Sequence, residues 1–147
     1  MKHYINHVQS FAQGMKAVDI AAIEPGDDPI LWLVEIKDYR IFPRSKPTDL
    51  FDEVAQKFRD TLAGLRIIAA RSTDVTEASR AKHACAAHSI RVLFHLEQPA
   101  THTKAFPQVI DPKLAVDIMK RKMKAVDATP LVGDAGTLKG KVNWTIT

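Results

Sequence analysis

Three charged side chains interrupt two stretches of the sequence that otherwise consist mainly of apolar residues: Asp19, Glu35 and Lys37. Glu35 and Lys37 lie two residues apart in the run Ile-Leu-Trp-Leu-Val-Glu-Ile-Lys-Asp at 30–38, so in a β-strand they point to the same face. Burying charge on a strand is costly unless the charges pair or hold a metal ion. These side chains are therefore the first candidates for chemistry.

A turn between the two stretches brings the acidic residues together. Residues 24–29, Glu-Pro-Gly-Asp-Asp-Pro, are rich in turn formers and separate two expected strands, at 16–23 and 30–38. A hairpin that pairs symmetrically about the middle of this turn puts Asp19 opposite Glu35, with Cβ atoms roughly 4.5–5.5 Å apart. Two carboxylates at that separation repel each other unless a cation lies between them.

A divalent cation such as Mg²⁺ or Mn²⁺ suits this pair, because it prefers hard oxygen ligands and keeps several bound waters. Lys37, the next side chain on the same face, is in place to position or deprotonate an attacking water, and a pKa depressed by burial favours deprotonation. Together these parts suit metal-assisted phosphodiester hydrolysis. The alternative is a same-face ion pair between Glu35 and Lys37 at a strand end, with Asp19 unrelated to it.

Apolar periodicity predicts the elements that hold the hairpin. After the hairpin, apolar residues recur every four positions, as in an amphipathic helix: Leu50, Val54, Phe58 and Leu62. Thr48 or Asp49 can cap this helix, which we expect to run towards Ala70. An alanine-rich helix is expected at 75–88 and a third strand at 90–96.

The last third of the chain predicts one more helix and an edge strand. Asp111 and Pro112 are typical of an N-cap and a first helical position. Three residues are expected on the buried face of this helix: Leu114, Ile118 and Val126. Residues 142–146 are expected to form an edge strand. The order hairpin, helices, strand, helix predicts a single α/β domain over residues 1–147, an α+β sandwich with a mixed sheet.

Asp19, the turn and the run Val-Glu-Ile-Lys-Asp-Tyr-Arg at 34–40 resemble the PD-(D/E)xK nuclease superfamily. The likeness covers residue 16 to about residue 96 and the helix that follows, and a group of bacterial proteins carries the same Glu-Ile-Lys-Asp-Tyr-Arg strand. It implies a restriction-endonuclease-like core, with a central hairpin in a mixed sheet flanked by helices. It further implies a metal held by Asp19, Glu35 and the carbonyl of Ile36, with Lys37 as the catalytic lysine.

The first helix of that superfamily often carries an acidic residue, whereas residues 1–18 contain neither Asp nor Glu. His3, His7 and Gln9 are candidates to replace it, and Val18 stands where the motif has proline. These departures leave two functions open: cleavage of nucleic acid, DNA above all, by a Mg²⁺-dependent nuclease, or a nuclease-fold binding or regulatory domain without catalysis.

A net charge of +4 and a pI of about 9.3 permit a polyanionic partner without requiring one. Five residues are candidates for nucleic-acid contact: Arg40, Arg44, Lys46, Gln56 and Lys57. The alternative for the helical residues is a solvated polar face with an ion pair between Glu53 and Lys57. The basic run at 120–124 complements the dipole at a helix end and is a further candidate for phosphate contact.

The other signals favour an intracellular protein without a membrane segment. Cys85 is the single cysteine, which favours a reducing, cytoplasmic setting, and we expect it to be buried in the core. Zinc binding with His83 and His88 is disfavoured, because helix positions 83 and 85 diverge by about 200°. No signal peptide or membrane-spanning run is seen. The edge strand at 142–146 motivates a third function, an oligomeric interaction module such as a homodimer.

Overall fold

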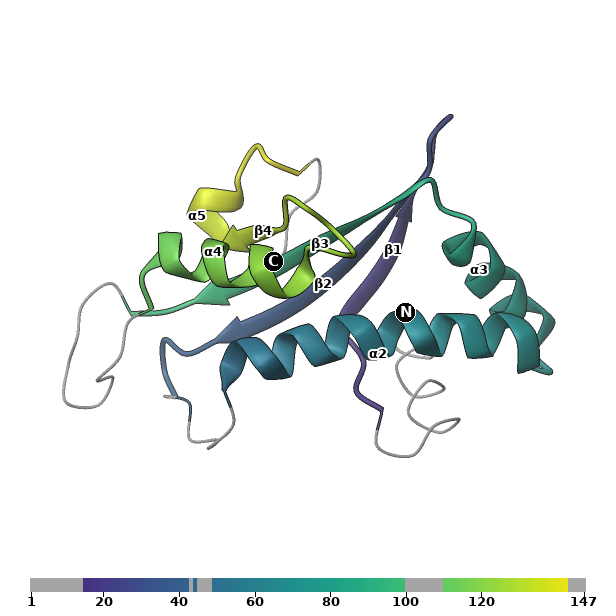
Figure 1. Cartoon of the computed structure of the whole chain (residues 1–147), viewed down its shortest axis with the longest axis horizontal. Helices are drawn as coiled ribbons and strands as arrows, with labels where there is room; N and C mark the ends of the chain where they lie inside the picture. The colour runs from purple at the N-terminus through teal and green to yellow at the C-terminus, as the bar shows by residue number, and fades with distance from the viewer. Residues whose placement is uncertain (1–14, 43, 45–48, 100–109, 143–147) are drawn as a thin grey trace.

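The computed structural model of the chain describes residues 15–42, 44, 49–99 and 110–142. Within these ranges it contains the following elements in chain order (Figure 1): β1 (Ile20–Glu24), β2 (Ile30–Asp38), α2 (Leu50–Arg71), α3 (Val75–Cys85), β3 (Ser89–Glu97), α4 (Pro112–Met123), β4 (Leu131–Gly133) and α5 (Ala135–Leu138). The expected α/β class is confirmed. The candidate first-helix residues His3, His7 and Gln9, and Lys46 of the loop, lie outside the described ranges.

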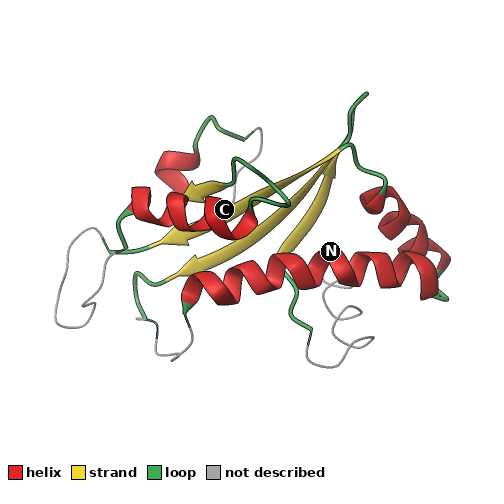
Figure 2. Ribbon diagram, viewed as in Figure 1, coloured by secondary structure: helices red, strands yellow, loops and turns green. Residues whose placement is uncertain are grey.

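The four described strands form one mixed sheet in the order β1-β2-β3-β4 (Figure 2). β1 and β2 are antiparallel, whereas β2 pairs with β3, and β3 with β4, in parallel. The hairpin therefore lies at one edge of the described sheet, whereas the resemblance implied a central position. Its register is the expected one, since Ile20 pairs with Val34 and Glu24 with Ile30, symmetrically about Asp27.

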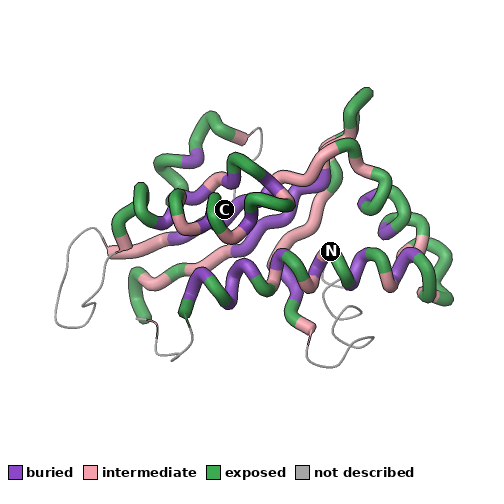
Figure 3. Tube along the Cα trace, viewed as in Figure 1, coloured by how far each residue is buried: buried purple, intermediate pink, exposed green. Residues whose placement is uncertain are grey.

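The two faces of β2 pack against different layers. Leu31 and Leu33 belong to the large core beneath α2 and α4, while Trp32 and Val34 join Leu138 of α5 on the opposite face. This alternation is the pattern of a strand buried on both sides. Figure 3 shows that buried positions follow the middle of β2 and β3 and the sheet-facing side of α2.

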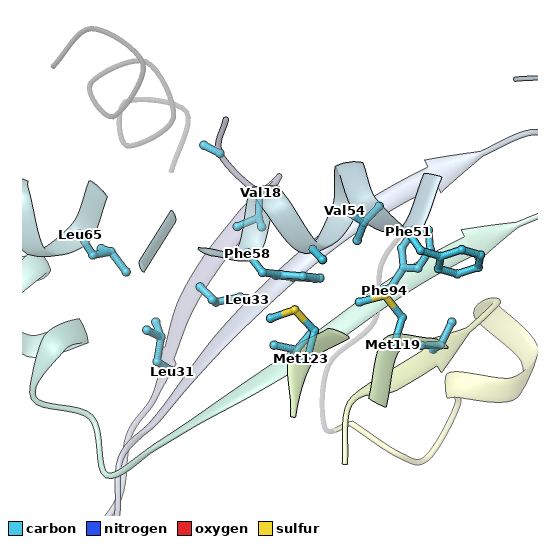
Figure 4. Close-up of a cluster of buried hydrophobic side chains, with 14 of the residues drawn as sticks. Val18, Leu31, Leu33, Phe51, Val54, Phe58, Leu65, Phe94, Met119 and Met123 are labelled. Atoms are coloured by element: carbon cyan, nitrogen blue, oxygen red, sulfur yellow. The ribbon is translucent and has the colours of Figure 1, made fainter. Parts of the chain in front are cut away.

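Phe58 of α2 lies at the centre of the larger core, close to Leu33 and Met123 (Figure 4). Phe51 packs edge-on against Phe94 of β3, with ring centroids 6.2 Å apart. Fully burying a side chain of this size contributes about 1.5–3 kcal/mol. This packing fixes α2 across the sheet, and with it the polar residues that α2 carries.

An aspartate caps the N-terminus of each of the four helices described after the hairpin. Side chains accept a backbone N–H of the first turn at four N-caps: Asp49, Asp74, Asp111 and Asp134. The expected start of α2 at Asp49 and of α4 at Asp111 is confirmed, and α2 runs one residue beyond Ala70.

Several boundaries differ from the sequence expectation. β1 begins at Ile20, because the backbone N–H groups of Lys16 and Val18 bond to side chains of α2. α3 ends at Cys85, before His88. Cys85 is exposed, so its expected burial was wrong. β4 and α5 were not predicted.

The buried face of α4 is also displaced by one position. Leu114 is 52% exposed, and the stripe that faces the core consists of Ala115, Met119 and Met123. Ile118 and Val126 pack only at its margin. Residues 143–146 of the expected edge strand lie outside the described residues, and Val142 forms an isolated bridge with Lys139. None of the described helices is long and apolar enough to cross a membrane.

Candidate functional site

The chain entering β1 is held on helix α2. The N–H of Val18 donates to the Thr61 hydroxyl at 2.9 Å, and the N–H of Lys16 donates to an Asp60 carboxylate oxygen at 2.9 Å. Because these bonds replace strand pairing before Ile20, they fix where Asp19 enters the sheet. Extending the β1–β2 register by one pair brings Asp19 alongside Glu35.

The Asp19 carboxylate lies against the backbone of β2. Its Oδ2 atom accepts the N–H of Ile36 at 2.8 Å. A carboxylate that accepts a backbone N–H has a fixed orientation, with its second oxygen directed elsewhere. Asp19 is thus placed at the backbone of Ile36, the residue between Glu35 and Lys37.

Glu35 is the most deeply buried charged group of the site, at 0% exposure. Its Oε1 atom accepts from two ammonium groups, Lys57 Nζ at 2.6 Å and Lys37 Nζ at 2.9 Å. Its Oε2 atom is the one buried side-chain polar atom of the described residues that has no hydrogen-bond partner. Such atoms are rare in folded proteins and mark places where a ligand, water or ion belongs.

Burial dominates the protonation of Glu35. Loss of hydration raises the pKa of Glu35, the neighbouring Asp19 charge adds to that rise, and the bonds from Lys57 and Lys37 oppose it without cancelling it. The site therefore holds a strained carboxylate, one whose charged form is disfavoured chiefly by burial.

Lys37 does not behave as the sequence predicted. Burial by itself lowers the pKa of Lys37, but the hydrogen bond and charge of Glu35 outweigh it, and the pKa lies above its ordinary value. The expected depression was wrong, because it considered burial without the adjacent carboxylate. The contact with Glu35 therefore favours the charged ammonium form of Lys37.

Polar contacts continue from Lys37 to the loop after β2. Lys37 Nζ lies 3.9 Å from Glu53 Oε1, and Glu53 Oε2 accepts from Arg44 at 2.9 Å. Arg44 also donates to the Tyr39 hydroxyl at 3.2 Å. Glu53 is only 6% exposed, so the expected solvated face of α2 is wrong at Glu53. Lys57 likewise turns towards the sheet to reach Glu35.

The four candidate nucleic-acid contacts that the structure describes are bonded to acids within the protein. Arg40 forms an ion pair with Asp38 at 2.6 Å, and this pairing lowers the pKa of Asp38 to about 2. Gln56 donates to Asp60 at 2.6 Å. With Arg44 and Lys57 bonded to acids as well, these described groups are not a free basic surface in this state.

The donor atoms fit a magnesium-type ion. The Asp19 charge is near enough to act on Glu35, whose buried Oε2 is unbonded, and Mg²⁺ is commonly held by one or two carboxylates and several waters. No cluster of three or more His, Cys, Asp or Glu residues suited to a metal occurs in the described ranges. Asp19, Glu35 and the carbonyl of Ile36 are the candidate ligands.

The sequence argument missed the contribution of α2. Lys57, Glu53 and Thr61 each contact the hairpin, its incoming chain or the loop that follows. Their spacing of four residues places them on one side of a helix, which was a usable signal. The sequence analysis offered Lys57 as a nucleic-acid contact or as part of a solvated face with Glu53, and it did not consider Thr61, because the direction of that side was not known. Near Cys85, His83 Nδ1 lies 2.8 Å from the Ser79 carbonyl oxygen, and His88 Nδ1 lies 3.6 Å from Asp28 Oδ1.

Comparison with known proteins yields one partial similarity. Over 136 residues the chain is 29% identical to the cysteine–tRNA ligase of Neisseria meningitidis. The match includes 87% of this chain but 19% of the ligase, so the chain spans about a fifth of that relative's length. No protein-family model matches the chain, and no solved structure matches it. These comparisons assign the chain to no family.

Proposed function

We propose that this chain hydrolyses phosphodiester bonds in nucleic acid, DNA above all, with a Mg²⁺ or Mn²⁺ ion held by Asp19 and Glu35. The observation that carries the proposal is the buried, unbonded Oε2 atom of Glu35 beside a second carboxylate. An unsatisfied buried polar atom costs about 1–3 kcal/mol. A cation bound to Glu35 Oε2 relieves that cost, whereas an ion pair through Oε1 alone leaves Oε2 without a partner.

Each residue of the site has a separate role in this proposal. Asp19 and Glu35 supply the anionic ligands, and the Ile36 carbonyl is the third candidate ligand. When bound, the ion supplies a Lewis acid for the phosphate and lowers the pKa of a coordinated water. Lys37 holds positive charge next to the reacting phosphate, where it stabilises the charge that develops. Its raised pKa favours this role over that of a general base.

The test is a cleavage assay on plasmid DNA, single-stranded DNA and RNA with Mg²⁺ or Mn²⁺. Transfer RNA is included because the similar protein is a tRNA ligase. We expect E35Q, D19N and K37M to lower the cleavage rate by at least about 100-fold, since each removes a charge that acts on the transition state.

Two matched controls lie on exposed helix positions: Asp117 on α4 and Lys82 on α3. D117N and K82M are expected to retain the wild-type cleavage rate. Cleavage that survives E35Q and K37M unchanged would come from a contaminant or another site, and would remove the proposal.

A binding or regulatory domain without catalysis is the second candidate. It is favoured by the lysine contacts, because Glu35 is already neutralised by two ammonium groups without any metal. This candidate predicts binding of Mn²⁺ or nucleic acid that depends on Glu35, with no turnover on any of the four substrates. The oligomeric module has no comparable support in the described residues.

A further inference from the structure

We propose that Lys57 is an internal competitor of the divalent ion: its ammonium neutralises Glu35 in the metal-free protein and leaves Glu35 when the ion binds. This inference rests on the proposed function, since it concerns the loading of the same site. It adds a residue that the hairpin motif does not contain, and it concerns metal affinity as well as catalysis.

The closest cation to Glu35 comes from a different element. Lys57 Nζ lies 2.6 Å from Glu35 Oε1, compared with 2.9 Å for Lys37 Nζ. Lys57 projects from α2, whereas Lys37 is on the same strand as Glu35. The Lys57 side chain is 16% exposed, so it has contact with solvent through which a flexible lysine stem can withdraw.

The charges of the site balance only without a metal ion. Asp19, Glu35 and Glu53 supply three negative charges, and Lys37, Lys57 and Arg44 supply three positive ones. A divalent ion added to this arrangement leaves two surplus positive charges in a partly buried space, where like charges repel strongly. Moving one ammonium group into water removes half of that surplus charge. Binding of the divalent ion therefore favours dissociation of one lysine from Glu35.

Lys57 is the better candidate for release. Lys37 has a second acid at hand, because Glu53 Oε1 lies 3.9 Å from its Nζ atom. The acid that Lys57 contacts among the described residues is Glu35. Once released, Lys57 lies beside the loaded site with a free ammonium group, in place to bind a phosphate oxygen of the substrate.

The experiment titrates the metal-free full-length chain with Mn²⁺ by calorimetry. K57M is expected to bind Mn²⁺ about tenfold more tightly than wild type, which corresponds to about 1.4 kcal/mol. K57R retains the competing charge and is expected to stay within about threefold of wild type. K82M, a lysine change on an exposed position of α3, is the matched control and is expected to bind as wild type does.

A second readout covers loss of stability in the variant. K57M is expected to melt at a lower temperature than wild type without metal, because Glu35 loses its nearest partner, and to gain more from Mn²⁺ than wild type does. K57Q provides a polar alternative if K57M does not fold.

The possible failures are distinct. Wild type and K57M that bind Mn²⁺ equally, or weaker binding by K57M, would overturn the competition while leaving the metal site intact. Absence of Mn²⁺ binding in wild type, K57M and K57Q alike would overturn the proposed function itself, and this inference with it.

Discussion

Glu35 is the residue at which opposing physical effects meet. Burial favours its neutral form, while two ammonium groups favour the carboxylate, and the net effect raises the pKa of Glu35. Replacing a buried charged network by apolar residues is often neutral or stabilising for folding. A site that retains one carboxylate, two lysines and an unbonded oxygen is therefore better explained by ligand binding than by stability.

The raised pKa of Glu35 predicts the direction of a pH effect on folding. Above the ordinary value of 4.5, the folded chain binds more protons at Glu35 than the unfolded chain. Its contribution to stability is thus complete below that pH and is lost as the pH rises through the folded-state pKa. The unfolding free energy of wild type minus that of E35Q should therefore decrease between pH 4.5 and the folded-state pKa in metal-free buffer.

Urea unfolding of the two proteins across this pH range makes the measurement. Taking the difference removes the titration of every other group to first order. A difference that increases with pH would mean that the lysine bonds outweigh burial, and the account of a strained carboxylate would then be wrong.

Helix α2 is the element that assembles the site. Its Lys57 and Glu53 contact residues of β2 and the following loop, and Thr61 holds the chain before β1. The same Thr61 hydroxyl donates to the Lys57 carbonyl at 2.7 Å, so one side chain joins the helix to the hairpin. The position of Asp19 therefore depends on α2 as well as on the hairpin.

Replacing this hydroxyl predicts a coupled loss of stability and metal affinity. T61V leaves the N–H of Val18 buried without an acceptor, at a cost of about 1–3 kcal/mol. Because Asp19 is then less firmly placed, Mn²⁺ affinity is expected to fall by about tenfold. Thermal unfolding and calorimetry measure the two effects, and T76V on exposed α3 is the control. If T61V is destabilised but binds Mn²⁺ with unchanged affinity, the prediction that the placement of Asp19 sets the metal affinity is wrong.

Strand β2 and the hairpin could be predicted from the sequence, because local residue patterns alone determine them. The strand at 30–38 matches β2, and the turn at 24–29 fixed the hairpin register. The three residues of β4 show no alternation that marks a strand, and their pairing with β3 depends on tertiary structure. On α4, the small residue Ala115 faces the core where Leu114 was expected, because packing beside Met119 and Met123 decides the face.

The site itself was predictable in part for the same reason. Hairpin register is local, so Asp19 and Glu35 were placed together from the turn alone. The contacts of Lys57 with Glu35 and of Arg44 with Glu53 join residues 22 and 9 positions apart, respectively, and depend on how α2 crosses the sheet. No periodicity in the sequence encodes that crossing.

At the scale of the whole molecule, α2 and α4 cover the face of the sheet that carries Glu35, and the site lies where α2 meets the C-terminal half of β2 (Figure 1). Two of the basic side chains that contribute to the net charge of +4, Arg44 and Lys57, form ion pairs with acids at this site. A polyanion therefore encounters a site whose cations are paired with acids, and under our proposal metal loading frees one of them.

The most direct measurement is the anomalous X-ray difference density of a crystal soaked in Mn²⁺. The account predicts one peak between Asp19 and Glu35, with Glu35 Oε2 about 2.0–2.2 Å from the ion, near the distances for small hard divalent cations. A fully soaked crystal with no peak at these carboxylates, or with both lysines still bonded to Glu35 and manganese bound elsewhere, would contradict it.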